Sequence, residues 1–192
     1  MTTSSAIETT TPPVAEPPAA ESALLAFLDE IGVAWTLERH VPLFTVEDSK
    51  AATGHMPGAH TKNLFLKQKK GGYVLVVCLE DRAIRIKNLE KAIGMKRLSF
   101  GSPEALGEVL DVIPGSVTPF GLFNDREAHQ VTLVLDQQMM EMDPLNYHPL
   151  HNEATITVNA KGLKNFFAAT GHTPILVDFD ALEAQSAQES VT

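Results

Sequence analysis

Two neighbouring apolar runs form the clearest pattern in the chain. In the first, 62–67, the polar pair Lys62-Asn63 precedes the apolar residues 64–66, and the run ends before the turn-forming pair Gly71-Gly72. The second, 73–79, is apolar on both faces, which is typical of a strand in the middle of a sheet. Two such runs joined by a lysine- and glycine-rich turn predict a β-hairpin in the core.

Helix signals are interspersed among further short strands. Apolar residues at helical spacing predict a helix over 22–31, which Gly32 ends. Ser102 and Asn159 stand at cap positions before two later helices. The remaining expected elements are helices over 45–52 and, capped by Asn88, over 89–93, and strands over 35–41, 83–86, 130–136, 154–158 and 175–179. Mixing of this kind predicts an α+β fold with a single mixed sheet flanked by helices.

Length and composition indicate one domain with a tail at each end. The chain has 192 residues, which fits one domain better than two. Residues 1–20 are rich in Thr, Pro and Ala and contain no aromatic residue, so a disordered N-terminal tail is expected. The folded domain is expected over 21–180, and 181–192 is expected to be a C-terminal tail.

Charge is distributed very unevenly along the chain. The net charge is −9, yet the segment 62–97 carries ten of the fifteen cations and three acids, which makes it +7. A basic block on an acidic protein predicts a local surface for phosphate groups. The alternative is a solvated surface whose charges pair with one another.

Several classes of chemistry are disfavoured by what the sequence lacks. The single cysteine, Cys78, excludes an intrachain disulfide and a cysteine-based zinc site, and it lies in an apolar strand. There is no G-x-S-x-G elbow and no phosphate-binding glycine fingerprint. No apolar run is long enough to cross a bilayer, and the N-terminus does not resemble a secretory signal, so we expect a cytoplasmic protein without membrane partners.

A metal site is the next possibility considered. His148 and His151 are three residues apart, and Asp143 is close in sequence. The two histidines flank Pro149 in a turn, whereas paired histidine ligands usually lie four apart on a helix. We therefore expect no metal and no cofactor, and a metal-dependent hydrolase remains an alternative.

Three polar features are left as a candidate site. They are the pair Lys62-Asn63 at the start of a strand, the proline- and glycine-rich loop 115–119, and the turn 148–152. Each has a plain structural interpretation: an exposed lysine that covers apolar surface, a rigid connection, and a turn histidine bonded to backbone. Taken together, in this order, they indicate a ligand site.

With these motifs the sequence resembles the YbaK-like editing domains, free-standing relatives of the domain inserted in bacterial prolyl-tRNA synthetases. The family's lysine–asparagine pair is Lys62-Asn63, its Gly-x-x-x-Pro loop is 115–119, and its histidine turn is His148-Pro149-Leu150. The resemblance extends from about residue 22 to residue 179. Within the family, the chain looks most like the group that removes alanine from mischarged tRNA(Pro), and the group that removes cysteine is the nearest alternative.

The resemblance implies roles for individual residues. Lys62 and Asn63 would bind the phosphate or ribose of the tRNA end, and the loop beginning at Gly115 would face the ester carbonyl with backbone amides. His148 would line the amino-acid pocket and exclude larger side chains. A water molecule would attack the ester, assisted by the neighbouring ribose hydroxyl. The other loop residues expected to contact substrate are Ser116, Val117, Thr118, Pro119 and Phe120.

The charge pattern is consistent with a tRNA substrate. Arg82, Arg85 and Lys87 follow the predicted hairpin and are expected to contact acceptor-stem phosphates. The expected partners are tRNA(Pro) mischarged with a small amino acid and, in addition, prolyl-tRNA synthetase. A tRNA-binding module that keeps the fold without hydrolysis is the alternative from another functional class.

Overall fold

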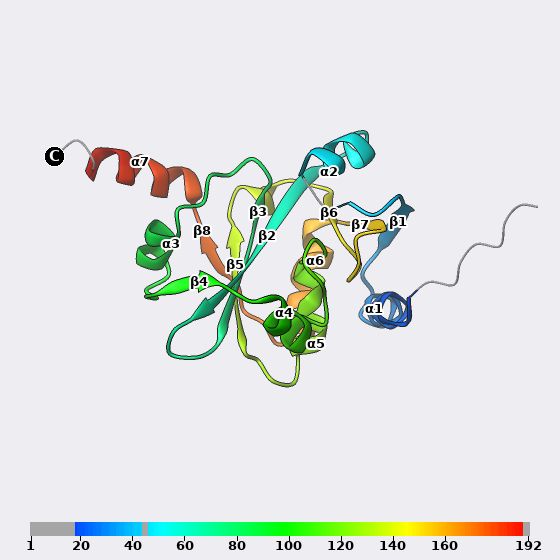
Figure 1. The fold of residues 1–192 in the computed structure, drawn as a ribbon. Helices are drawn as coiled ribbons and strands as arrows, with labels where there is room; N and C mark the ends of the chain where they lie inside the picture. Colours follow the sequence, from blue (N-terminus) through cyan, green and yellow to red (C-terminus); the bar gives the residue numbers. More distant parts are fainter. Residues whose placement is uncertain (1–17, 44–45, 190–192) are drawn as a thin grey trace, which may run out of the picture.

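The computed structural model describes residues 18–43 and 46–189. Eight strands lie within these ranges. They are β1 (Trp35–Arg39), β2 (Ala59–Gln68), β3 (Tyr73–Leu79), β4 (Leu98–Phe100), β5 (Val131–Asp136), β6 (Leu145–Tyr147), β7 (Ala154–Val158) and β8 (Ile175–Val177). They form one sheet in the order β1-β7-β6-β2-β3-β5-β8, and β4 pairs with β2 outside this path (Figure 1).

The helices of the same ranges cover the two faces of this sheet. They are α1 (Ala19–Glu30), α2 (Val46–Thr53), α3 (Ile86–Ala92), α4 (Pro103–Leu110), α5 (Leu122–Asp125), α6 (Ala160–Ala169) and α7 (Phe179–Glu189), with 3-10 turns η1 (Pro119–Gly121) and η2 (Met139–Glu141). Both parallel and antiparallel pairs occur, so the predicted α+β fold with a single mixed sheet is confirmed. No helix in the described part is long and apolar enough to span a bilayer.

The hairpin of β2 and β3 lies at the centre of the sheet, as the sequence predicts. Its antiparallel register sets Asn63 opposite Val77 and Lys62 opposite Cys78. Because strand side chains alternate between faces, the two cores share these strands. Phe65, Leu75 and Val77 pack in one apolar cluster, with α1, α4, α5 and α6. Leu66, Val74, Val76 and Cys78 pack in the other, with α3 and the start of α7. Figure 1 shows these helix groups on opposite sides of the sheet.

One edge of β2 is only partly covered. On the side away from β3, the strand pairs with β6 at Ala59 and His60 and with β4 over 66–68. Between these two short ladders no strand of the described ranges pairs with this edge. Lys62 and Asn63, both half-buried, lie in that interval beside the open edge.

Local signals in the sequence placed most helix ends correctly. Ser102 Oγ accepts a hydrogen bond from the Ala105 amide at 3.2 Å, and Asn159 Oδ1 accepts one from Gly162 at 2.6 Å. Gly32 follows α1 with φ of 70°, a left-handed conformation that glycine adopts without strain. These caps confirm the predicted helix starts and the predicted stop.

Three local predictions were wrong. Residues 83–86 do not form a strand, because β3 already has β2 and β5 as neighbours and offers no free edge. Asn88 is not a cap, since α3 begins at Ile86 with Arg85 at the cap position. The loop after Gly115 was expected to lack regular structure, but η1 begins at Pro119, a residue whose fixed φ suits a first helical turn.

The tail predictions meet the structure only in part. Residues 1–17 lie outside the described residues, and α1 already begins at Ala19. At the other end, α7 occupies most of the segment 181–192 that was expected to be a tail. Tyr147 belongs to β6, so the histidine turn 148–152 follows directly after this strand.

Candidate active site

A small polar pocket lies where β2, β6 and β7 meet the end of α2. Its volume is about 30 Å³. The lining residues are Thr53, His60, Thr61, Asn63, Asn146, Tyr147, His148 and Thr155. Asn63 and His148 are 85 positions apart in the sequence, and the parallel pairing of β6 with the start of β2 brings their strands together. Two of the three predicted motifs therefore share one pocket.

Asn63 connects this pocket with the third motif. Its Nδ2 donates a hydrogen bond to the carbonyl oxygen of Val117 at 2.9 Å, which also fixes the orientation of the amide. Its Oδ1 is buried and has no partner among the described residues, and the same holds for Ser116 Oγ. Buried polar atoms without partners are costly in water-free surroundings. A bound molecule with its own donor and acceptor groups would satisfy both atoms.

The loop around Gly115 is held by its own hydrogen bonds. Gly115 has φ of 88°, which glycine adopts readily, and Thr118 Oγ1 accepts from the Phe120 amide at 3.3 Å. Phe120 is fully buried and packs edge-on against Tyr147 at a centroid distance of 5.9 Å. The amides of Gly115, Val117 and Thr118 have no acceptor within the described part of the chain. A fixed loop with unused amides can serve as a preorganised donor set.

His148 is a half-buried, neutral wall of the pocket. Its Nδ1 donates to the carbonyl oxygen of Ala154 at 3.2 Å, since a carbonyl can only accept. Its ring lies 6.3 Å from that of His40, measured between centroids, in an edge-on arrangement. Burial lowers the pKa of His148, and the nearby His40 and His151 act in the same direction, against the hydrogen bond to Ala154. The side chain is therefore uncharged near neutral pH.

Lys62 lies on the opposite face of β2 from Asn63. It shares that face with Leu64 and Leu66 and sits across from Cys78, whereas Asn63 shares its face with Phe65. The half-buried ammonium donates to the backbone carbonyl oxygen of Arg82. The predicted pair is thus split across the two faces, although both residues border the open edge of β2.

The three cations predicted to bind phosphate have different surroundings. Arg85 and Lys87 are exposed. Arg82 is not a free cation, because its guanidinium donates to Asp136 at 2.8 Å, to Gln138 at 2.5 Å and to Asp180. Only 10% of its side chain is exposed. The charge of Arg82 is therefore compensated by two carboxylates of the protein, and its assignment to phosphate binding stays a prediction that this pairing disfavours.

The histidine turn does not assemble a metal site. His151 Nε2 lies 2.5 Å from Glu21 Oε2, and the same buried carboxylate accepts from Arg39 at 2.6 Å. His151 therefore binds Glu21 of α1 and does not form a ligand set with His148. No group of three potential ligand side chains that could hold a metal ion occurs in the described ranges.

Sequence reasoning missed several pocket residues. Asn146 binds the loop before β2, since its Nδ2 donates to Pro57 at 2.9 Å and its Oδ1 accepts from Thr157 at 2.7 Å. Thr155 accepts or donates at 2.9 Å with His40. In the sequence, Asn146 and Thr155 are simply polar residues within short strands, a pattern that is also typical of surface positions. The split of Lys62 and Asn63 was predictable from strand alternation.

Comparison with known proteins agrees with this arrangement. A family model for the aminoacyl-tRNA editing domain matches residues 40–166, a range that contains all three motifs. The prolyl-tRNA synthetase associated domain-containing protein 1 of Xenopus laevis is 38% identical over 162 residues, covering 82% of this chain and 95% of that protein. The prolyl-tRNA editing protein ProX of Acetoanaerobium sticklandii is 35% identical over 155 residues, covering 80% and 94%.

Solved structures share the fold at lower sequence identity. The crystal structure of a proposed trans-editing enzyme for prolyl tRNA synthetase superposes with a TM-score of 0.66 at 17% identity, covering 85% of this chain and 98% of that one. The family match, the identities above 30% over most of both chains and the shared fold confirm the resemblance to YbaK-like domains. The chain belongs to the aminoacyl-tRNA editing domain family.

Proposed function

We propose that the protein is a cytoplasmic trans-editing deacylase that hydrolyses the ester of tRNA(Pro) mischarged with alanine. The observation that carries the proposal is the pair of buried atoms without partners, Asn63 Oδ1 and Ser116 Oγ. They lie where β2 meets the Gly115 loop, beside the pocket that His148 lines. An aminoacyl ester offers an ammonium and ribose hydroxyl groups to such atoms. The names of the relatives, which refer to prolyl-tRNA editing and to prolyl-tRNA synthetase, support tRNA(Pro) as the carrier.

The chemistry needs no protein nucleophile. A water oxygen adds to the ester carbonyl carbon, and the negative charge that forms on the carbonyl oxygen is stabilised by the unused amides of Gly115, Val117 and Thr118. The carbon–oxygen bond to the ribose then breaks, and the ribose oxygen takes a proton to regenerate its hydroxyl group. The free amino acid leaves with the oxygen supplied by water. Asn63 would hold the α-ammonium through Oδ1 while its Nδ2 stays on Val117.

Selection among amino acids would rest on size. Alanyl and prolyl esters present similar polar groups, so the pocket must exclude the larger ring by shape. A volume of about 30 Å³ between rigid strands leaves little room beyond a small side chain. His148 is held in that wall by its bond to Ala154 and by contact with His40. A cysteinyl ester is the competing substrate, because its side chain is only slightly larger than that of alanine.

The tRNA body would contact the exposed basic surface near the open edge of β2. Arg85 directly precedes α3 and Lys87 lies in the first turn of that helix; both are exposed, as are Lys67, Lys69 and Lys70 around the β2–β3 turn. A-form stems are recognised mainly through phosphates and the shallow minor groove, so a basic surface without base contacts is sufficient. Lys62, at the open edge, would hold the phosphate or ribose of the terminal nucleotide.

The proposal is tested by deacylation of a matched panel of substrates. Purified full-length protein is incubated with alanyl-, cysteinyl- and prolyl-tRNA(Pro), with and without EDTA. We expect rapid loss of alanine, slower loss of cysteine, little loss of proline and no effect of EDTA. Binding of tRNA without ester hydrolysis would instead support a non-catalytic module, and loss of activity with EDTA would support a metal-dependent hydrolase.

A further inference from the structure

Arg82 is the centre of a charged network on the far side of β3 from the pocket. Asp136, at the end of β5, is completely buried, and its Oδ2 accepts a hydrogen bond from Arg82 Nε at 2.8 Å. The same carboxylate also accepts from the amides of Leu79 at 3.3 Å and Gln138 at 3.0 Å. A buried carboxylate with this many donors holds its partner in one geometry. The irregular segment after β3 is therefore tied to β5 through the Arg82 side chain.

The backbone of the same residue holds Lys62. The Arg82 carbonyl oxygen accepts from Lys62 Nζ, so the side chain and the main chain of Arg82 face different partners. A lysine side chain is free to adopt many rotamers, and one fixed acceptor removes much of this freedom before substrate arrives. An ammonium has three donors, so two remain for a phosphate or ribose.

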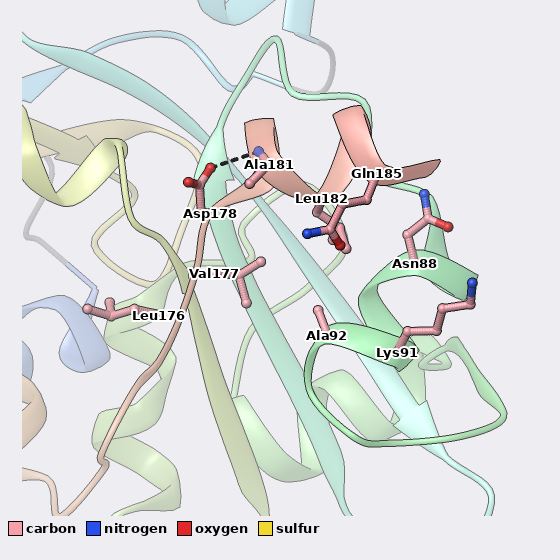
Figure 2. A pocket seen from close by; sticks show the side chains of 9 residues that line it. All are labelled: Asn88, Lys91, Ala92, Leu176, Val177, Asp178, Ala181, Leu182 and Gln185. Atoms are coloured by element: carbon pink, nitrogen blue, oxygen red, sulfur yellow. Dashed lines mark hydrogen bonds between the residues drawn. The ribbon is translucent and has the colours of Figure 1, made fainter. Parts of the chain in front are cut away.

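Helix α7 supplies the third contact of Arg82. Asp180, in its first turn, accepts from both terminal nitrogens of the guanidinium. Figure 2 shows how the start of this helix is fixed, with Asp178 Oδ1 accepting from the Ala181 amide at 3.0 Å. Hydrogen bonding to Arg82 lowers the pKa of Asp180, which keeps the carboxylate charged. The Arg82 guanidinium thus links α7 to the residue whose backbone carbonyl oxygen binds Lys62.

We propose that Asp136, Arg82 and Asp180 are positioning residues that orient the Lys62 ammonium at the open edge of β2, and that α7 is therefore a working part of the editing site. The inference rests on the proposed function, in which Lys62 holds the tRNA end. It assigns to Arg82 an indirect role in place of phosphate binding. It also gives a role to a helix that lies beyond residue 166, where the family match ends.

The informative variant is Asp180→Ala, because 62% of the Asp180 side chain is exposed and its loss leaves the buried Asp136 contact intact. The matched control is Glu183→Ala, which removes an exposed carboxylate from the same helix. We expect Asp180→Ala to lower kcat for alanyl-tRNA(Pro) by about 2- to 30-fold, with little change in KM or in the unfolding temperature. Glu183→Ala should match wild type.

Two further readouts separate positioning from a structural effect. In a Lys62→Ala background, Asp180→Ala should cause no additional loss, because the group it orients is gone. Trace acetylation followed by mass spectrometry should show faster labelling of Lys62 in Asp180→Ala and in Arg82→Lys than in wild type, relative to the exposed Lys67. The acetylation measurement does not require the protein to hydrolyse any ester.

The outcomes are distinguishable. If wild type hydrolyses none of the esters, the proposed function is wrong, and the labelling experiment alone decides whether the network holds Lys62. If wild type is active and Lys62→Ala is slow, but Asp180→Ala equals Glu183→Ala in rate and labelling, the positioning role is overturned. Additive losses in the double variant would also overturn it.

Discussion

The replacement of Asn63 by alanine tests the link between the pocket and the loop. The change removes the hydrogen bond from Nδ2 to Val117 and leaves that carbonyl oxygen without its donor. A polar group left unsatisfied in such half-buried surroundings costs about 1–3 kcal/mol of unfolding free energy. For a domain of this size each kcal/mol corresponds to about 2–4 °C, so we expect the melting temperature to fall by about 2–12 °C.

Asn63→Ala should lower kcat/KM by more than its loss of stability accounts for. Asn63 Oδ1 is buried without a partner, and the proposed ligand is the charged ammonium of the aminoacyl group. A hydrogen bond to a charged group contributes about 1.5–3 kcal/mol, which corresponds to a fall in kcat/KM of about 10- to 150-fold. The measurement is deacylation of alanyl-tRNA(Pro) at a temperature where the variant is fully folded.

Asn124→Ala is the matched control. Asn124 Nδ2 donates to the Leu110 carbonyl oxygen at 2.8 Å, so the same chemical change breaks the same kind of bond outside the pocket. Both variants should lose similar stability, and only Asn63→Ala should lose activity. The reasoning is refuted if Asn63→Ala keeps the wild-type rate, or if the two variants lose activity in proportion to their loss of stability.

Four further outcomes are expected. Lys62→Ala should abolish deacylation while the protein stays folded, and a wild-type rate would remove Lys62 from the site. Neutralising Arg85 and Lys87 together should raise the KM for tRNA and reduce the log–log salt slope by about one unit for each phosphate that these cations neutralise in the complex; an unchanged slope would place the tRNA elsewhere. His148→Ala should raise the ratio of prolyl to alanyl deacylation, whereas an equal fall of both rates would assign His148 to the chemistry. Burial lowers the pKa of His148, so the unfolded state binds the proton more readily and the free energy of unfolding should fall as the pH drops below about 6.5. Urea unfolding of wild type and His148→Gln between pH 7.5 and 5.5 should show a smaller fall in the variant. Parallel curves for the two proteins would contradict this.

The order of the three motifs and the central hairpin were readable from the sequence because their causes are local. The apolar runs 64–66 and 73–79 are visible from which residue follows which. The caps at Ser102 and Asn159 bind amides three residues away, so a short window contains all of the interaction. The same locality allowed the resemblance to the editing family to be recognised before any fold was known.

What the tertiary structure decided involves partners that are distant in the chain. The sequence predicted Arg82 to be a phosphate-binding cation, yet its charge is compensated by Asp136 and Asp180, which lie 54 and 98 positions away. The open edge of β2 exists because β6 and β4 each pair with only a short part of it. Strand order and ion pairing across such distances depend on how the whole chain packs. The residues next to Arg82 or β2 in the sequence do not determine them.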